Sequence, residues 1–167
     1  MNQKMQTEKL GDLLRKVKLT ISTAESCTAG GVGAAVASVD GASDYYVGGA
    51  ICYATRLKEE LLGVSHDVIR CFGVVSKETA LAMNEGIRNL TKSDIAISTT
   101  GYAGANGGDE FAENGTVWIC VAANNHQPYL RKIMVENDRT TNLQEVVRTA
   151  IDMAVEYVGR LHEYKQC

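Results

Sequence analysis

Several features that mark other classes of protein are scarce in this sequence of 167 residues. It has a single proline, Pro128, and no low-complexity tract, so nothing indicates a linker and we expect residues 1–167 to form one domain. Its apolar stretches fall far short of the roughly 20 residues that a membrane span requires, and its N-terminus has charged residues in place of a signal-peptide core. We therefore expect a cytoplasmic protein that does not associate with membranes.

Charge and cysteine content exclude further classes. Seventeen basic and twenty acidic residues give a net charge of -3 without any basic run, so we do not expect nucleic acid as a partner. We expect the partner to be a small molecule or a protein. The histidines stand far apart without metal-ligand spacing, and an odd number of cysteines stand singly, at Cys27, Cys52, Cys71, Cys120 and Cys167. We expect neither a metal site nor a disulfide framework, and we expect Cys52 and Cys120, which lie in apolar runs, to be small buried hydrophobic residues.

The periodicity of apolar residues predicts helices that alternate with strands. Helices are expected up to Lys18, at residues 28–39, from Lys58 to a stop at Gly63, at 67–71, from a Ser76 cap to residue 90, and from a Thr141–Gln144 capping box to residue 161. Strands are expected at residues 19–24, 47–53, 94–99, 115–123 and 129–136, the last two joined by a hairpin turn. This order predicts a three-layer α/β/α domain whose mixed sheet is mostly parallel and ends in a C-terminal antiparallel hairpin.

The segment at residues 21–31, ISTAESCTAGG, is the most informative part of the chain. It runs from an apolar strand through a hydroxyl-rich turn into a helix that opens with small residues. Ser26 or Thr28 at such a corner presents an exposed oxygen, and a nucleophile there is helped by the positive end of the following helix. The same corner also suits an anion, or the two hydroxyls only cap the helix. The segment alone leaves these three interpretations open.

Two residues, one at the end of the second expected strand and one just beyond it, extend the hypothesis of a serine nucleophile. Ligands of open α/β sheets bind beyond the carboxyl ends of the strands, where Tyr53 and Lys58 follow. A lysine whose pKa is lowered by burial serves as a base toward a serine, and a tyrosine relays the proton or donates to an oxyanion. The alternatives are that Lys58 is a solvated helix lysine and Tyr53 a sheet aromatic.

A glycine-dense loop and an arginine are candidates for anion binding. Residues 101–108 offer several unobstructed backbone N–H groups, although neither GxxxxGK[ST] nor GxGxxG is present. The loop therefore binds a phosphate or an oxyanion, or it is a flexible surface turn. Arg139 precedes the final helix, where its guanidinium either holds a phosphate through two parallel hydrogen bonds or is an ordinary surface arginine.

Taken together, these segments resemble the CinA C-terminal domain family, whose members include nicotinamide mononucleotide deamidases. The matching segments keep their order along the chain and are TAESCT at 23–28, GAS at 41–43, Tyr53, KEELLGV at 58–64, GVVS at 73–76, TGYAG at 100–104, GTVW at 115–118 and DR at 138–139. Several separated matches in one order are much more specific than any single motif.

The resemblance implies a three-layer α/β/α domain, often a homo-oligomer, that hydrolyses the carboxamide of nicotinamide mononucleotide to nicotinate mononucleotide and ammonia without a metal or cofactor. By position it implies Ser26 as the nucleophile, with Lys58 and Tyr53 as acid/base partners. The implied substrate-binding residues include backbone donors at the helix start and a phosphate-holding arginine; they are Glu25, Thr28, Gly30, Gly31, Thr100, Gly101, Gly104, Gly107 and Arg139.

The sequence departs from the family pattern around the presumed nucleotide site. It has Ala29 where the family usually reads ESCTGG, Tyr102 and Ala105 where it reads TGIAGP, Glu113 near the start of the GTV run, and Asn137 where a glycine commonly precedes Asp-Arg. Glu113 would repel a phosphate if the two lie close, and Tyr102 adds bulk where substrate passes. The alternative function is therefore a catalytically silent relative that binds a nucleotide or acts as a regulatory protein.

Overall fold

The computed structural model describes residues 3–164, so Cys167 lies outside the described residues. Along the chain the elements are α1 (Gln3–Val17), β1 (Ile21–Glu25), α2 (Gly31–Ala37), η1 (Ala42–Asp44), β2 (Tyr46–Ile51), α3 (Thr55–Leu62), α4 (His66–Phe72), α5 (Lys77–Thr91), β3 (Ile95–Gly101), β4 (Thr116–Ala123), β5 (Tyr129–Met134) and α6 (Arg139–Tyr164). The alternation of helices and strands that the periodicity predicts is therefore present.

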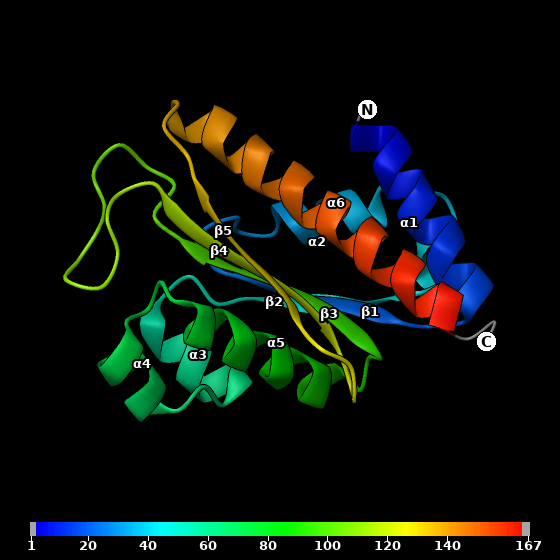
Figure 1. The fold of residues 1–167 in the computed structure, drawn as a ribbon, viewed down its shortest axis with the longest axis horizontal. Helices are drawn as coiled ribbons and strands as arrows, with labels where there is room; N and C mark the ends of the chain where they lie inside the picture. The colour runs from blue at the N-terminus through cyan, green and yellow to red at the C-terminus, as the bar shows by residue number, and fades with distance from the viewer. Residues whose placement is uncertain (1–2, 165–167) are drawn as a thin grey trace.

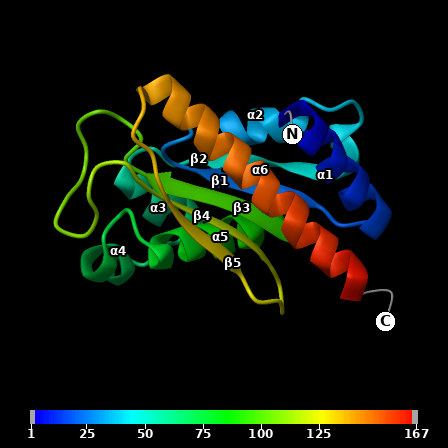
Figure 2. The same cartoon turned by 45° about the horizontal axis from the view of Figure 1, so that its top comes forward.

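The five strands form one mixed sheet in the order β2-β1-β3-β4-β5. The β1–β2 and β1–β3 pairs are parallel, and the β3–β4 and β4–β5 pairs are antiparallel. Helices α1, α2 and α6 cover one face of the sheet and α3, α4 and α5 the other (Figure 1, Figure 2). The predicted three-layer α/β/α fold with a mixed sheet is confirmed. Its antiparallel part includes the β3–β4 pair as well as the predicted C-terminal hairpin of β4 and β5.

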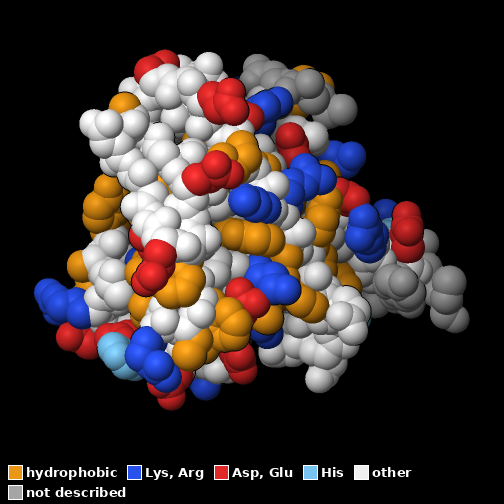
Figure 3. Space-filling view, turned by 60° about the vertical axis from the view of Figure 1, so that its left-hand side comes forward, with side chains coloured by type: hydrophobic (Ala, Val, Ile, Leu, Met, Phe, Trp, Pro, Cys, Tyr) orange, Lys and Arg blue, Asp and Glu red, His pale blue; other side chains and the backbone are white. Residues whose placement is uncertain are grey.

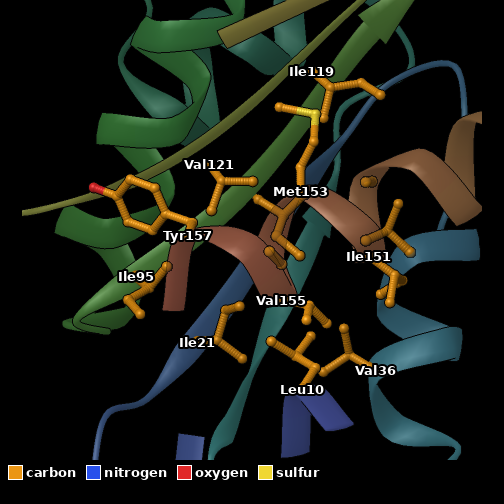
Figure 4. Close-up of a cluster of buried hydrophobic side chains, with 14 of the residues drawn as sticks. Leu10, Ile21, Val36, Ile95, Ile119, Val121, Ile151, Met153, Val155 and Tyr157 are labelled. Carbon is orange, nitrogen blue, oxygen red and sulfur yellow. The ribbon is translucent and has the colours of Figure 1, made fainter. Parts of the chain in front are cut away.

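The central strands lie between two apolar layers. All five residues of β1 are buried, as expected for a strand covered on both faces. The larger cluster packs the sheet against α1, α2 and α6 (Figure 4) and includes Leu10, Ile21, Val36, Ile95, Ile119, Val121, Ile151, Met153, Val155 and Tyr157. A smaller cluster beneath α3 and α5 contains Cys52, Leu62, Met83 and Ile87. Full burial of one such aliphatic side chain contributes about 1.5–3 kcal/mol, so these layers hold the strand ends in fixed positions.

Three predicted helix starts differ from the structure by more than one residue, and one of them is that of α3, which begins at Thr55 instead of Lys58. The final helix begins at Arg139, and its cap is Asp138, whose Oδ1 accepts the N–H groups of Thr140 at 3.0 Å and Thr141 at 3.1 Å. The predicted Thr141–Gln144 capping box is therefore wrong, because the acidic side chain three residues earlier satisfies the helix start. Helix α2 begins at Gly31 instead of residue 28, since residues 26–30 form a turn. The predicted cap at Ser76 is confirmed, and its Oγ accepts the Thr79 N–H.

The topology brings two strand ends together at one edge of the sheet. From β1 the chain crosses to β2 on one side, whereas from β3 it continues to β4 on the other, so the strand order reverses between β1 and β3. Ligands of open α/β sheets bind at such a switch point. Here the Ser26 N–H, directly after β1, donates to the Thr99 carbonyl of β3 at 3.0 Å. The predicted nucleophile corner and the glycine-dense loop thus begin side by side.

None of the helices in the described part of the chain combines the length and the hydrophobicity that crossing a membrane requires.

Candidate active site

A cavity of about 300 Å³ opens at the switch point of the sheet. Its lining comes from the corner after β1, the segment that joins β2 to α3, the residues before α5, the loop after β3 and the first residue of α6. These lining residues are Ser26, Cys27, Tyr53, Thr55, Lys58, Val74, Val75, Thr100, Gly101, Tyr102, Ala103, Gly104, Asn106, Gly107 and Arg139. Eight of the predicted site residues therefore face one cavity.

The buried end of this cavity holds a serine–lysine pair. Lys58 is 0% exposed, and its Nζ donates to Ser26 Oγ at 3.0 Å and to the Cys52 carbonyl at 2.8 Å. Ser26 itself is only 7% exposed. The interpretation of Lys58 as a solvated helix lysine is therefore wrong, since α3 directs the side chain inward to the end of β1.

The surroundings of Lys58 favour its neutral form. Burial lowers its pKa below the ordinary 10.5, and nearby Cys52 and Cys27 only partly oppose this shift. Both of its hydrogen-bond partners are uncharged oxygens, so no carboxylate holds the proton on the amine. A neutral amine beside Ser26 Oγ is able to accept the serine proton, which is the arrangement that activates a hydroxyl nucleophile.

The neighbouring thiols are not activated in this way. Burial raises the pKa of Cys27 to about 12, so its sulfur stays protonated at neutral pH although it lines the cavity. Cys52 and Cys120 are buried, as predicted from their apolar runs. At this corner the hydroxyl of Ser26, and not the adjacent thiol, is therefore the group suited to nucleophilic attack.

Tyr53 lies at the exposed mouth of the cavity, apart from the serine–lysine pair. It is 59% exposed. Within residues 3–164 its hydroxyl accepts a hydrogen bond from Arg139 Nη2 at 3.0 Å and has none to Ser26 or Lys58. The structure thus brings the predicted trio to one cavity but joins only two of its members, and it pairs the third with the predicted phosphate-binding arginine.

Glu25 has a structural position behind the nucleophile corner. It is 2% exposed, and it accepts the backbone N–H groups of Gly30 at 3.0 Å, Val32 at 2.9 Å and Gly33 at 2.7 Å. Thr28 Oγ1 donates to the same carboxylate at 2.6 Å. The interpretation in which Ser26 and Thr28 cap α2 is wrong, because Glu25 satisfies these helix-start donors.

Among the expected oxyanion donors at residues 28–31, the N–H groups of Ala29, Gly30 and Gly31 are consequently occupied. Besides the N–H groups that Glu25 accepts, the Gly31 N–H donates to the Thr28 carbonyl and the Ala29 N–H to the Ser26 carbonyl. Gly30, with φ of 98°, turns the chain into the helix, and a Cβ at Gly31 would lie 3.0 Å from Val147 of α6. Glu25, Thr28, Gly30 and Gly31 are not among the cavity-lining residues, so their predicted contact with substrate is not seen.

The loop after β3 forms an opposite wall of the cavity. Thr100 Oγ1 donates to the Val74 carbonyl at 2.8 Å, and backbone hydrogen bonds join Tyr102 to Thr116 and to Gly115. This loop is therefore tied at its base, unlike the flexible surface turn that was the alternative.

Two further residues of this region bear on the predicted phosphate site. A Cβ at Gly104 would lie 3.3 Å from Arg139 Nη1, so the absence of a side chain leaves room for the guanidinium. Glu113, which the sequence suggested as a source of repulsion, does not line the cavity. The cavity mouth therefore presents a cation and glycine backbone.

Some lining residues carried no recognisable signal in the sequence. Thr55 and Val74 line the cavity although no pattern in the sequence assigned them to the site, and the same holds for the Cys52 carbonyl, which orients Lys58. An acidic residue just before a helix of small residues is a signal for the helix-start role of Glu25.

In the described part of the chain, no cluster of three or more His, Cys, Asp or Glu side chains is arranged to hold a metal ion. In the space-filling view of Figure 3, acidic and basic side chains are interspersed among hydrophobic ones on the face shown.

The fold and this cavity define a three-layer α/β protein with a buried serine–lysine pair at the switch point of its sheet. Comparison with known proteins narrows the class to one family. The sequence model of the CinA C-terminal domain matches residues 3–158, and the chain belongs to that family.

Curated relatives of this chain carry the name of the family. A CinA-like protein of Flavobacterium psychrophilum is 48% identical over 113 residues, which are 68% of this chain and 27% of that protein. A CinA-like protein of Salinibacter ruber is 40% identical over 145 residues, which are 87% of this chain and 35% of that protein. The chain thus spans between 27% and 35% of the length of these curated relatives.

Solved structures agree with the fold. The crystal structure of a competence-damaged protein (CinA) superfamily protein from Klebsiella pneumoniae is 27% identical, with a TM-score of 0.91 over 96% of this chain and 99% of that chain. The competence/damage inducible protein CihA from Agrobacterium tumefaciens is 29% identical, with a TM-score of 0.87 over 92% of this chain and 94% of that chain.

Proposed function

We propose that this protein is an amidohydrolase that converts nicotinamide mononucleotide to nicotinate mononucleotide and ammonia. The observation that carries the proposal is the hydrogen bond between Lys58 Nζ and Ser26 Oγ, made by a lysine that is 0% exposed and has a lowered pKa. The substrate follows from the resemblance of this chain to a family with nicotinamide mononucleotide deamidases among its members.

The proposed reaction has two halves that use the same pair of residues. Ser26 Oγ attacks the carboxamide carbon while its proton passes to the neutral amine of Lys58, which gives a tetrahedral oxyanion. The C–N bond then breaks, the nitrogen takes the proton from Lys58, and ammonia leaves an acyl ester on Ser26. Water attacks this ester with Lys58 as base, and the return of the proton to Ser26 Oγ releases the nicotinate product.

The oxyanion and the phosphate need separate donors. Because the N–H groups of residues 29–33 already have acceptors and Thr28 does not line the cavity, the backbone N–H group that directly follows the nucleophile, at Cys27, is the proposed oxyanion donor. The proposed phosphate partner is Arg139, whose planar guanidinium lies across the cavity mouth between Tyr53 and Gly104. This division agrees with the buried serine at one end of the cavity and the exposed cation at the other.

The test is ammonia release by purified protein supplied with nicotinamide mononucleotide. The parent is expected to release ammonia and nicotinate mononucleotide in equal amounts, and Ser26→Ala to be slower by at least about 10³-fold, since removal of a nucleophile leaves only binding and the oxyanion donors. Calorimetric binding to Ser26→Ala is expected to stay close to the parent affinity. A parent rate in Ser26→Ala contradicts the nucleophile, and binding without turnover in the parent favours the silent nucleotide-binding alternative.

A further inference from the structure

Tyr102 stands out among the residues that line the cavity, because its aromatic ring is held in place from several sides. Its hydroxyl donates to Asp109 Oδ2 at 2.8 Å. Asp109 is fixed in turn, since its Oδ1 accepts the N–H groups of Phe111 at 2.9 Å and Ala112 at 2.8 Å. The Tyr102 side chain also packs against Gly107, where a Cβ would lie 3.2 Å from Tyr102 Cδ1.

The same loop is also anchored to the far side of the cavity. Phe111 covers Gly73, where a Cβ would lie only 2.7 Å from the Phe111 side chain. Gly73 directly precedes Val74 and Val75, which line the cavity. The Tyr102 ring is thus supported by a chain of contacts that runs through Asp109 and Phe111 back to the cavity wall.

The position of Tyr102 relative to the nucleophile suits a flat ligand. The Ser26 N–H donates to the Thr99 carbonyl, so Ser26 lies beside Thr99, and Tyr102 follows Thr99 by three residues. An extended chain rises about 3.3 Å per residue, so Thr99 and Tyr102 are about 10 Å apart along the backbone. Aromatic rings pair with their centroids about 4.5–7 Å apart. Ser26 and Tyr102 line the same cavity of about 300 Å³, so a ring attached directly to a carbonyl carbon at Ser26 shares that space with the Tyr102 side chain.

We propose that Tyr102 is a specificity-determining residue of this cavity, whose ring stacks on the flat ring of an aromatic carboxamide, and that Asp109 is the positioning residue that orients it. The inference rests on the proposed function and adds the residue by which this chain recognises the ring. The pyridinium of nicotinamide mononucleotide carries a positive charge, which the face of a tyrosine attracts. Aliphatic carboxamides lack this interaction and are poor substrates.

The state of the phenol supports this role. Burial and the hydrogen bond to Asp109 raise the pKa of Tyr102 to about 12, so the hydroxyl keeps its proton at neutral pH and remains a donor to the carboxylate. The opposite role for the same ring is obstruction, in which it occupies the space that substrate needs. The two roles predict opposite effects of removing the ring.

The experiment compares two ligands in the Ser26→Ala background, where turnover does not interfere. Nicotinamide mononucleotide contains the ring, and ribose 5-phosphate shares its sugar and phosphate only. Calorimetry is expected to show that Tyr102→Leu weakens binding of the mononucleotide about 10-fold, which is about 1.4 kcal/mol, and leaves ribose 5-phosphate unchanged. Tyr129→Leu is the matched control, because Tyr129 also has a hydrogen-bonded hydroxyl, to Glu156, but does not line this cavity.

Asp109 is tested by a double-mutant cycle with the same ligands. Asp109→Ala is expected to weaken mononucleotide binding about 3-fold on its own and to have no further effect once Tyr102→Leu is present, because it acts only through the ring. Tyr102→Phe keeps the ring and is expected to resemble Asp109→Ala. Additive effects of Asp109→Ala and Tyr102→Leu overturn the positioning role.

The remaining outcomes separate this inference from the proposed function. Tighter mononucleotide binding or faster turnover in Tyr102→Leu overturns the inference in favour of obstruction, and equal weakening of both ligands overturns it in favour of a merely structural loop role. If the parent binds the mononucleotide in a Tyr102-dependent way but releases no ammonia, the proposed function fails and the inference stands. Failure of the parent and of Ser26→Ala to bind the mononucleotide overturns both.

Discussion

The two ends of the cavity differ in how their residues are held. Lys58 and Ser26 at the inner end are 0% and 7% exposed, and strand ends, a helix and a backbone carbonyl fix them. At the mouth, the 59% exposed Tyr53 pairs with Arg139 through one solvent-accessible hydrogen bond. An exposed hydrogen bond contributes little net stability, so the mouth can rearrange around a ligand whereas the inner end cannot. Chemistry is therefore assigned to the rigid end, and phosphate binding to the adaptable one.

The largest effect is expected from Lys58→Arg, which keeps the charge at the inner end but removes the ability to lose a proton. A guanidinium stays protonated, so it cannot accept the Ser26 proton, and kcat is expected to fall by about 10³-fold or more. Ammonia-release kinetics measure the loss. Lys77→Arg, a change at an exposed lysine, is the control and should retain the parent kcat. Near-parent activity in Lys58→Arg would show that the base lies elsewhere.

The pH dependence of the parent tests the same residue without a mutation. Burial lowers the pKa of Lys58 below its ordinary 10.5, and the neutral amine is the active base. As pH rises through the lowered pKa, the fraction of neutral amine increases, so kcat/KM is expected to increase and then level off. A pH–rate profile measures this, and a kcat/KM that falls over the same range contradicts Lys58 as a base.

Glu25→Ala is expected to change stability more than any substitution at the mouth. It leaves the buried N–H groups of Gly30, Val32 and Gly33 without their acceptor, which corresponds to about 3 kcal/mol of lost unfolding free energy. Urea denaturation measures the loss. Glu60→Ala, which removes an exposed carboxylate paired with Arg56, should stay within about 0.5 kcal/mol of the parent. Unchanged stability in Glu25→Ala would mean that the helix start does not depend on this carboxylate.

At the mouth, Arg139→Ala is expected to raise KM about 10-fold and to change kcat less than about 3-fold, because a charge-assisted phosphate contact is made in both the bound substrate and the transition state. Steady-state kinetics separate the two parameters. Arg56→Ala, which removes a surface arginine on α3, serves as the control. A large fall in kcat at unchanged KM would place Arg139 in the chemical step instead.

The smallest effect is expected from Tyr53→Phe, which removes only the hydroxyl that accepts the Arg139 hydrogen bond. KM is expected to rise about 2- to 5-fold, corresponding to the roughly 0.5–1 kcal/mol of one exposed hydrogen bond, with kcat unchanged. If Tyr53 instead serves as an acid/base partner of Ser26, kcat should fall by about 10²-fold or more, and the distinction between the two ends of the cavity would no longer hold.

How far the sequence predicts this protein depends on the range of the interaction concerned. The helix–strand alternation and the Ser76 cap follow from local patterns, and the structure confirms them. The predicted start of the last helix is wrong because two local caps compete there, and Asp138 satisfies the first N–H groups. For Glu25, the sequence indicated proximity to the site but not the direction of the carboxylate, which turns inward to α2.

The sequence by itself determined the class of fold and the candidates for chemistry, because apolar periodicity and the order of short motifs are properties of the chain. It did not determine that Lys58 is buried against Ser26, that Tyr53 pairs with Arg139, or that Tyr102 is held by Asp109. Each of these depends on side chains from segments distant in sequence or on a folded loop. Only the tertiary structure decided them, because burial and distance, which set a pKa and a hydrogen bond, exist only once the sheet has assembled.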